Sequence, residues 1–242
     1  MNINEIIPFL SSIIMIAFAV DVFRRFARRP SHTHLLVWGI GLAMFALGTL
    51  SEVVLNLTWN EVAFRSWYLF GAILTAAWIG QGTLYLLVRK PWVRIVTIIL
   101  TVLSVGVAVW LWVTPVVASG FQLGTPISLQ YGNVLPKGEP VRLSTIPFNI
   151  YGTLTLVGGA LWSGYLFWRK RVLPNRVIGN VLIAAGALSV AAASTLARLG
   201  NGSFLFLGEL AAALLMYAGF ILASQPTAVE EKTPQGQTVQ AE

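Results

Sequence analysis

Seven long apolar stretches, separated by short polar or basic links, dominate this sequence. Each is about 19–26 residues long, enough for a helix to span a bilayer core of about 30 Å at 1.5 Å per residue. Lipid cannot satisfy bare backbone groups, and the alternation typical of barrel strands is missing. We therefore predict an all-α bundle in residues 1–224 whose seven membrane-crossing helices cover 5–23, 35–56, 63–88, 93–113, 147–168, 177–199 and 204–223.

Composition supports lipid as the solvent of this chain. Hydrophobic residues make up 56% of it and charged residues 10%, whereas a soluble domain carries about 25% charged residues. The net charge is +7, but the basic residues sit in short clusters between apolar runs, so nucleic acid is not an expected partner. The sequence contains no cysteine, which excludes disulfides, thiolate metal sites and cysteine nucleophiles. The expected partner is the lipid bilayer, in the inner (plasma) membrane of a cell.

The distribution of Lys and Arg predicts the orientation. Three links carry eleven basic residues, whereas the other side of the predicted bundle carries four, namely Arg65, Lys137, Arg142 and Arg198. Positive charge stays on the cytoplasmic side. We therefore expect the amino terminus outside and the carboxyl terminus in the cytoplasm, followed by a disordered polar tail over 225–242.

The loop over 114–146 is the one substantial polar segment between the predicted helices. Four prolines interrupt it, and Ile127-Ser128-Leu129-Gln130-Tyr131 alternates between apolar and polar residues before Gly132-Asn133. This pattern favours a short outer β-hairpin. Its expected role is a lid over the outer face, with a passive connector as the alternative.

A weak internal repeat relates the two halves of the chain. Ile7-Pro8-Phe9 opens the first apolar stretch, and Ile146-Pro147-Phe148 opens the fifth. Residues 48–52 parallel 194–198, and residues 69–71 parallel 206–208. Helices 1–3 and 5–7 should run in the same direction, with helix 4 joining them. This predicts a 3+1+3 arrangement of parallel repeats, a plan known among transporters.

In helix count, orientation and layout the chain resembles SWEET-type transporters and microbial rhodopsins. It departs from both, because helices 2 and 6 lack proline and helix 7 lacks the lysine that would bind retinal. As a whole the sequence also resembles uncharacterised bacterial seven-helix integral membrane proteins. No functional residue carries over from any of these proteins.

Four ionisable residues are expected at similar depth near the outer ends of the helices, namely Glu52, Arg65, Arg198 and Glu209. Charge at such depth is costly and tends to face the bundle interior and to pair. One interpretation is an outward-facing polar pocket in which the two glutamates bind a cation or proton and the arginines are their partners. The alternative is a structural ion-pair network, or arginines that reach the headgroups.

Gly80-Gln81-Gly82 and Trp78 mark the middle of the third helix. Gln81 is a candidate ligand deep in the bundle, and Trp78 a candidate wall of the same pocket. A packing notch with Gln81 hydrogen-bonded to a neighbouring helix is the alternative. Small-residue stripes in helices 5 and 6 indicate close helix packing, with homo-oligomer formation as a lesser alternative.

Catalysis and metal binding have little support in the sequence. The two histidines, His32 and His34, lie in a basic link without a nearby carboxylate. We predict neither an enzyme nor a metal or cofactor site. The favoured function is binding or transport of a small solute or lipid through the outward pocket. The alternative is a sensory or scaffold subunit that acts through a membrane partner.

Overall fold

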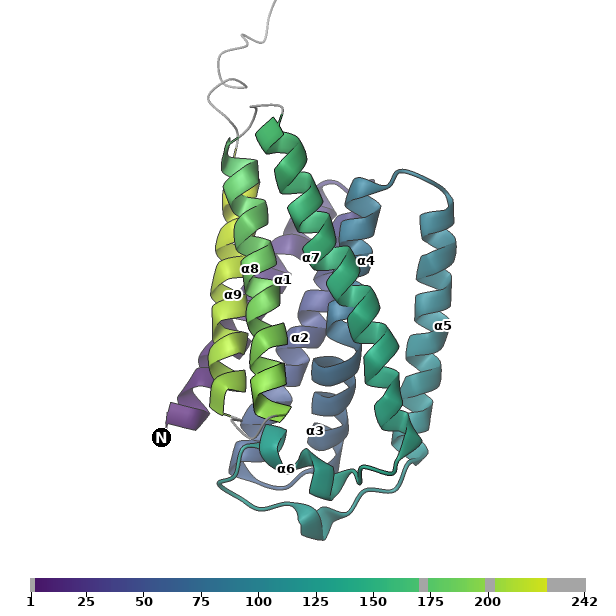
Figure 1. Cartoon of the computed structure of the whole chain (residues 1–242), viewed down its shortest axis with the longest axis vertical. Coiled ribbons are helices and arrows are strands. Elements are labelled where there is room, and N and C mark those ends of the chain that lie inside the picture. The colour runs from purple at the N-terminus through teal and green to yellow at the C-terminus, as the bar shows by residue number, and fades with distance from the viewer. Residues whose placement is uncertain (1–2, 170–173, 199–202, 226–242) are drawn as a thin grey trace, which may run out of the picture.

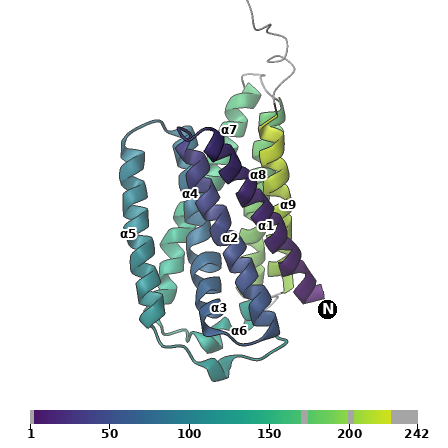
Figure 2. The same cartoon turned by 180° about the vertical axis from the view of Figure 1, so that it is seen from behind.

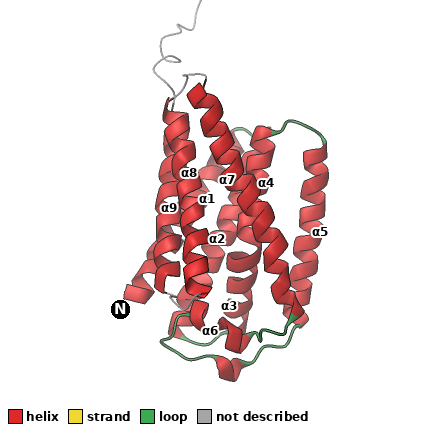
Figure 3. Ribbon diagram, in the orientation of Figure 1, coloured by secondary structure: helices red, strands yellow, loops and turns green. Residues whose placement is uncertain are grey.

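The computed structural model of the chain describes residues 3–169, 174–198 and 203–225. These residues are all-helical, without a strand, as Figure 3 shows. The prediction of an all-α fold is therefore confirmed. The long helices are α1 (Ile3–Arg28), α2 (Thr33–Leu57), α5 (Trp92–Val113), α7 (Thr145–Arg169), α8 (Pro174–Arg198), α9 (Ser203–Ala223), and a continuous rod made of α3 (Glu61–Ser66), the π-helical η1 (Trp67–Leu74) and α4 (Thr75–Leu87).

Six of these helices are long and apolar enough to cross a membrane. All six lie within α1, α2, the α3–η1–α4 rod, α5, α8 and α9. The remaining long helix, α7, has 25 residues and is not among these six. The arrangement is that of a multi-pass membrane protein, and many of its large apolar side chains face outward.

The helices form a closed ring. Around the ring, α1 packs on α2, α2 on the α3–η1–α4 rod, α4 on α7, α7 on α8, α8 on α9, and α9 on α1 again. Close approach of α4 and α7 depends on two glycines, since a Cβ added at Gly152 would lie 2.6 Å from the Ala76 carbonyl oxygen and one at Gly80 would lie 3.0 Å from the Gly152 carbonyl oxygen. Glycine permits such backbone contact between helices in lipid.

Helix α5 stands outside the ring. Figures 1 and 2 show it at the edge of the bundle, and its main contacts are with α4, η1 and the short helix η3 (Pro140–Ser144). Most of its side chains are exposed, among them Ile98, Val102 and Val109. Polar hydrogen bonds, described below, attach it to the ring.

The two ends of the bundle differ in character. At one end, here called the basic end, lie Arg24 to Arg29, Arg89 to Arg94, Arg169 and Arg176. At the other, the loop end, lie the start of α1, the end of α2 and the segment over 114–144 (Figure 1). The sequence asymmetry in charge is thus an asymmetry between the two ends.

The loop-end segment is helical, so the predicted β-hairpin is wrong. It contains η2 (Ala118–Gly120), α6 (Ile127–Val134) and η3. Ile127 and Val134 are buried and Tyr131 is partly buried. These three follow the i, i+4, i+7 spacing of a helix. A five-residue alternation of apolar and polar residues is too short to distinguish a strand from such a helix. Helix α6 packs against α2 and α8 and covers the loop end of the ring.

Candidate functional site

Two carboxyl groups meet inside the ring near its loop end. Glu52 lies in the last part of α2, and Glu209 lies in the first part of α9. Their carboxyl groups lie close enough to interact electrostatically. Because α1 stands between α2 and α9 in the ring, the two side chains meet across the interior. We refer to Glu52 and Glu209 as the carboxyl pair.

The carboxyl pair is deeply buried and short of donors. Glu52 is 0% exposed and Glu209 is 8% exposed. Both oxygens of Glu52 and Oε2 of Glu209 lack a hydrogen-bond partner among the described residues. Two ionised carboxylates can only accept hydrogen bonds, and they cannot both stay charged at this separation. The two groups therefore form a buried acid pair that has no basic partner among the described side chains.

By contrast, polar side chains close to the pair have hydrogen-bond partners. One turn before Glu52, Thr49 accepts a hydrogen bond from the Ser12 hydroxyl at 2.9 Å and donates to backbone carbonyls of its own helix. Ser12 also contacts the Pro8 carbonyl at 2.8 Å. The shortage of donors at the carboxyl pair is thus not a general feature of the α1–α2 contact.

Among the described side chains, no other charged group forms an ion pair with the carboxyl pair. Arg65 and Glu61, both on α3, pair with each other at 2.7 Å. The side chain of Arg198, at the end of α8, lies outside the described residues. The predicted pairing of Glu52 with Arg198 stays a prediction, whereas Arg65 does not complete a network with Glu209.

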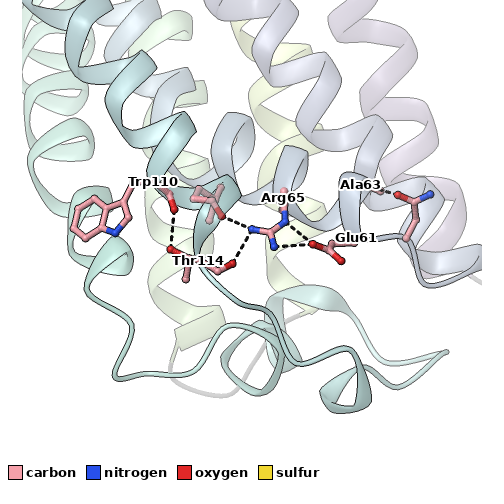
Figure 4. Close-up of polar contacts among 7 residues, drawn as sticks. Glu61, Ala63, Arg65, Trp110 and Thr114 are labelled. Carbon is pink, nitrogen blue, oxygen red and sulfur yellow. Dashed lines mark hydrogen bonds and ion pairs between the residues drawn. The ribbon is translucent and has the colours of Figure 1, made fainter.

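Arg65 instead binds the end of α5 (Figure 4). Its guanidinium donates to the Leu111 carbonyl and, at 3.0 Å, to the Thr114 carbonyl. In a continuing helix the Leu111 carbonyl would accept from residue 115, but Pro115 has no N–H to donate. Arg65 therefore supplies the missing donor, and its charge suits the carboxyl end of a helix.

Trp78 and Gln81 also face α5. The Trp78 indole donates to the Ser104 hydroxyl at 3.1 Å. The Gln81 amide donates to the Val93 carbonyl at 3.1 Å and to the Thr97 hydroxyl at 2.7 Å. Tyr151 of α7 donates to the Gln81 amide oxygen. These contacts match the alternative interpretation of Gln81, in which its buried amide hydrogen-bonds to neighbouring helices.

The predicted six-residue pocket is therefore divided. Glu52 and Glu209 lie together inside the ring. Arg65, Trp78 and Gln81 lie on the other side of the α3–η1–α4 rod and hold α5.

Apolar side chains fill the ring between the carboxyl pair and the basic end. The buried cluster includes Met15, Phe45 and Ala213. A cavity of about 20 Å³ lies within it and has a wholly apolar lining that every helix of the ring contributes to, namely Phe18, Trp38, Leu42, Ile79, Leu156, Ile183, Met216 and Phe220. That volume is near the minimum for one water molecule. The described side chains that line this layer are thus apolar.

Sequence reasoning missed Ser128. Its hydroxyl is buried on α6 and has no hydrogen-bond partner among the described residues. The prediction of a strand over residues 127–131 gave Ser128 no buried position. The helical spacing of Ile127, Tyr131 and Val134 was the signal that could have placed Ser128 on a helix.

Metal binding by several side chains is not evident in the described residues, where no three His, Asp or Glu side chains gather in a metal-binding arrangement. The chemistry of the site is that of one buried acid pair. No family model matches the chain, and no curated protein or solved structure is detectably similar to it.

Proposed function

We propose that this protein is a non-enzymatic, multi-pass plasma-membrane protein that binds a small cationic solute at an outward-facing site formed by Glu52 and Glu209. The observation that carries the proposal is the carboxyl pair, which is buried and has no basic partner among the described side chains. Ionisable residues within membrane segments are rare and mark ligand, ion or proton sites, so acidic groups without a basic partner are suited to a positive ligand.

The orientation and the seven crossings belong to the same proposal. With α7 as the seventh crossing, the basic end lies in the cytoplasm and the loop end lies outside. The carboxyl pair is then close to the outer surface and separated from the cytoplasm by the apolar layer.

The order of helices around the ring supports the proposed 3+1+3 repeat. Exchanging α1 with α7, α2 with α8, and the α3–η1–α4 rod with α9 converts the list of ring contacts into itself. One detail agrees with the sequence match: Gly71 lies against Gly48 of α2, and Gly208 lies against Ala193 of α8. Superposing the two triplets in chain order tests the repeat.

One observation favours a second candidate function. The packed apolar layer between the carboxyl pair and the basic end would stop a ligand that binds at the pair from passing through the bundle. A sensory subunit needs only to bind its ligand, whereas a transporter would have to open the apolar layer to let the ligand through. Uptake of a labelled solute into proteoliposomes separates the two functions, because only a transporter would accumulate it.

The binding proposal predicts stabilisation by cations that depends on both glutamates. Saturating cation should raise the melting temperature of the purified protein by several degrees, because a ligand that binds only the folded state stabilises it. Glu52→Gln and Glu209→Gln should each abolish this rise. The measurement is thermal unfolding in detergent at constant ionic strength.

Glu61→Gln is the matched control for this experiment. Glu61 is a glutamate at the same end, but it is half-exposed and bound to Arg65, so this variant should keep the cation response. A response that survives in Glu52→Gln and Glu209→Gln would refute the proposed site.

A further inference from the structure

Unsatisfied buried oxygens gather at the loop end of the bundle. Among the described residues, four buried side-chain oxygens lack a hydrogen-bond partner, and they belong to Glu52, Glu209 and Ser128. Ser128 is 7% exposed and lies on α6, which packs against α2 and α8. Buried polar atoms are nearly always paired in native proteins. Three such residues, on three elements at one end of the ring, offer acceptor oxygens that the described residues leave free.

Aromatic rings lie at the same level. The backbones of α2 and η1 run in opposite directions and approach at Gly48 and Gly71. One turn nearer the loop end, α2 carries Glu52 and η1 carries Trp67 and Tyr68. The rings of Trp67 and Tyr68 each contact Tyr131 of α6, with centroids 6.0 and 6.1 Å apart. The element that brings Ser128 to the site therefore also brings an aromatic ring.

We propose that the ligand of this site is a small primary amine in its ammonium form, bound by Glu52, Glu209 and the Ser128 hydroxyl beneath α6. This inference rests on the proposed function and names its ligand class. An ammonium group has three N–H donors and no acceptor, which matches three residues that offer acceptor oxygens. Its single positive charge also offsets the negative charge that either carboxyl group carries when ionised.

A metal ion fits the same groups less well. Hard cations such as Ca²⁺ take six to eight oxygen ligands, more than these side chains supply. Aromatic faces, by contrast, attract organic cations.

Helix α6 is held firmly enough to present Ser128 at a fixed place. The Gln130 side chain accepts from the Gln122 amide at 2.6 Å and donates to the Gln122 carbonyl at 2.9 Å. Arg142 donates to the Leu135 carbonyl at 2.7 Å and lies over the Tyr131 ring.

The test compares four probes on the purified full-length protein, as chloride salts where charged and at constant ionic strength. The probes are butylammonium, tetramethylammonium, Na⁺ and uncharged butanol, and the readout is the concentration dependence of the melting temperature. Butylammonium should stabilise the protein saturably, whereas butanol should not. Tetramethylammonium, which has the charge but no N–H donor, should bind more weakly than butylammonium.

Variants of Ser128 test its part. Ser128→Ala should weaken butylammonium binding about tenfold, the effect of one hydrogen bond to a charged group, while Ser128→Thr, which keeps the hydroxyl, should restore it. Ser119→Ala is the matched control, because Ser119 is an exposed serine in the same loop segment, and it should leave binding unchanged.

Each contrary result has a distinct meaning. If Na⁺ stabilises the protein through Glu52 and butylammonium does not, the proposed function stands and the amine inference fails. If no cation stabilises it, both fail. If tetramethylammonium binds as tightly as butylammonium, or Ser128→Ala behaves like Ser119→Ala, the hydrogen-bonded ammonium site is refuted.

Discussion

Replacing Gly152 with alanine is expected to lower the free energy of unfolding by about 3 kcal/mol, the upper part of the range for overpacked cores. The added methyl group would lie 2.6 Å from the Ala76 carbonyl oxygen and from the Ala77 amide nitrogen. These are backbone atoms of a helix, so neither can rotate away as a flexible side chain could. Helix α7 would have to move away from α4, and the ring would loosen at that contact.

Gly158→Ala provides a control within the same helix. A Cβ at Gly158 meets no atom within 4 Å, and alanine is favoured over glycine in a helix by about 0.5–1 kcal/mol. This variant should therefore be as stable as the parent or slightly more so. The comparison is made by thermal or denaturant unfolding in detergent. Equal stability of the two variants would show that α4 and α7 are not in backbone contact.

Arg65→Leu is the second variant with a large expected effect, a loss of about 3 kcal/mol. Hydrogen bonds that involve a charged group contribute about 1.5–3 kcal/mol each, and the guanidinium makes two with the last turn of α5. Without it the Leu111 carbonyl has no donor, because Pro115 cannot replace Arg65. We expect the end of α5 to detach, which hydrogen exchange over residues 107–114 would detect.

Two further variants separate this effect from a surface ion pair. Glu61→Gln should cost little, because the Glu61 side chain is 55% exposed and exposed ion pairs contribute about 0–1 kcal/mol. Arg65→Lys should restore part of the stability, since an ammonium group can reach one carbonyl but lacks the planar fork of donors. If Glu61→Gln were as damaging as Arg65→Leu, the ion pair would be the main contribution of Arg65.

The sequence predicted the helices well because lipid imposes one simple requirement on them. A membrane-spanning segment has to be apolar over its whole length, so composition alone marks it. The loop at 114–144 escapes that requirement. There the fold depends on tertiary contacts such as the burial of Ile127 and Val134, and a five-residue alternation could not distinguish a helix from a strand.

The sequence predicted the height of the site residues along their helices, but not the side to which each side chain points. Glu52 and Glu209 were expected at one level, and they do meet. Arg65 was expected at the same level too, yet its side chain leaves the ring because Pro115 creates an unsatisfied carbonyl on the opposite face. Sequence gives the height of a residue along a helix. Which side it faces depends on neighbours that the chain brings together only when folded.

The position of α5 has a consequence for assembly. The ring closes through the contacts of α4 with α7 and of α1 with α9, and none of these contacts requires the chain to be continuous at residues 88–91. The chain therefore consists of two parts, one before and one after this link, that pack against each other as two subunits would. Co-expressed fragments, cut at this link, each retain complete helices and a complete half of the interface. They should reconstitute the bundle without any covalent connection. In the intact chain, α5 and the link before it then serve as a tether that fixes a one-to-one ratio of the two halves.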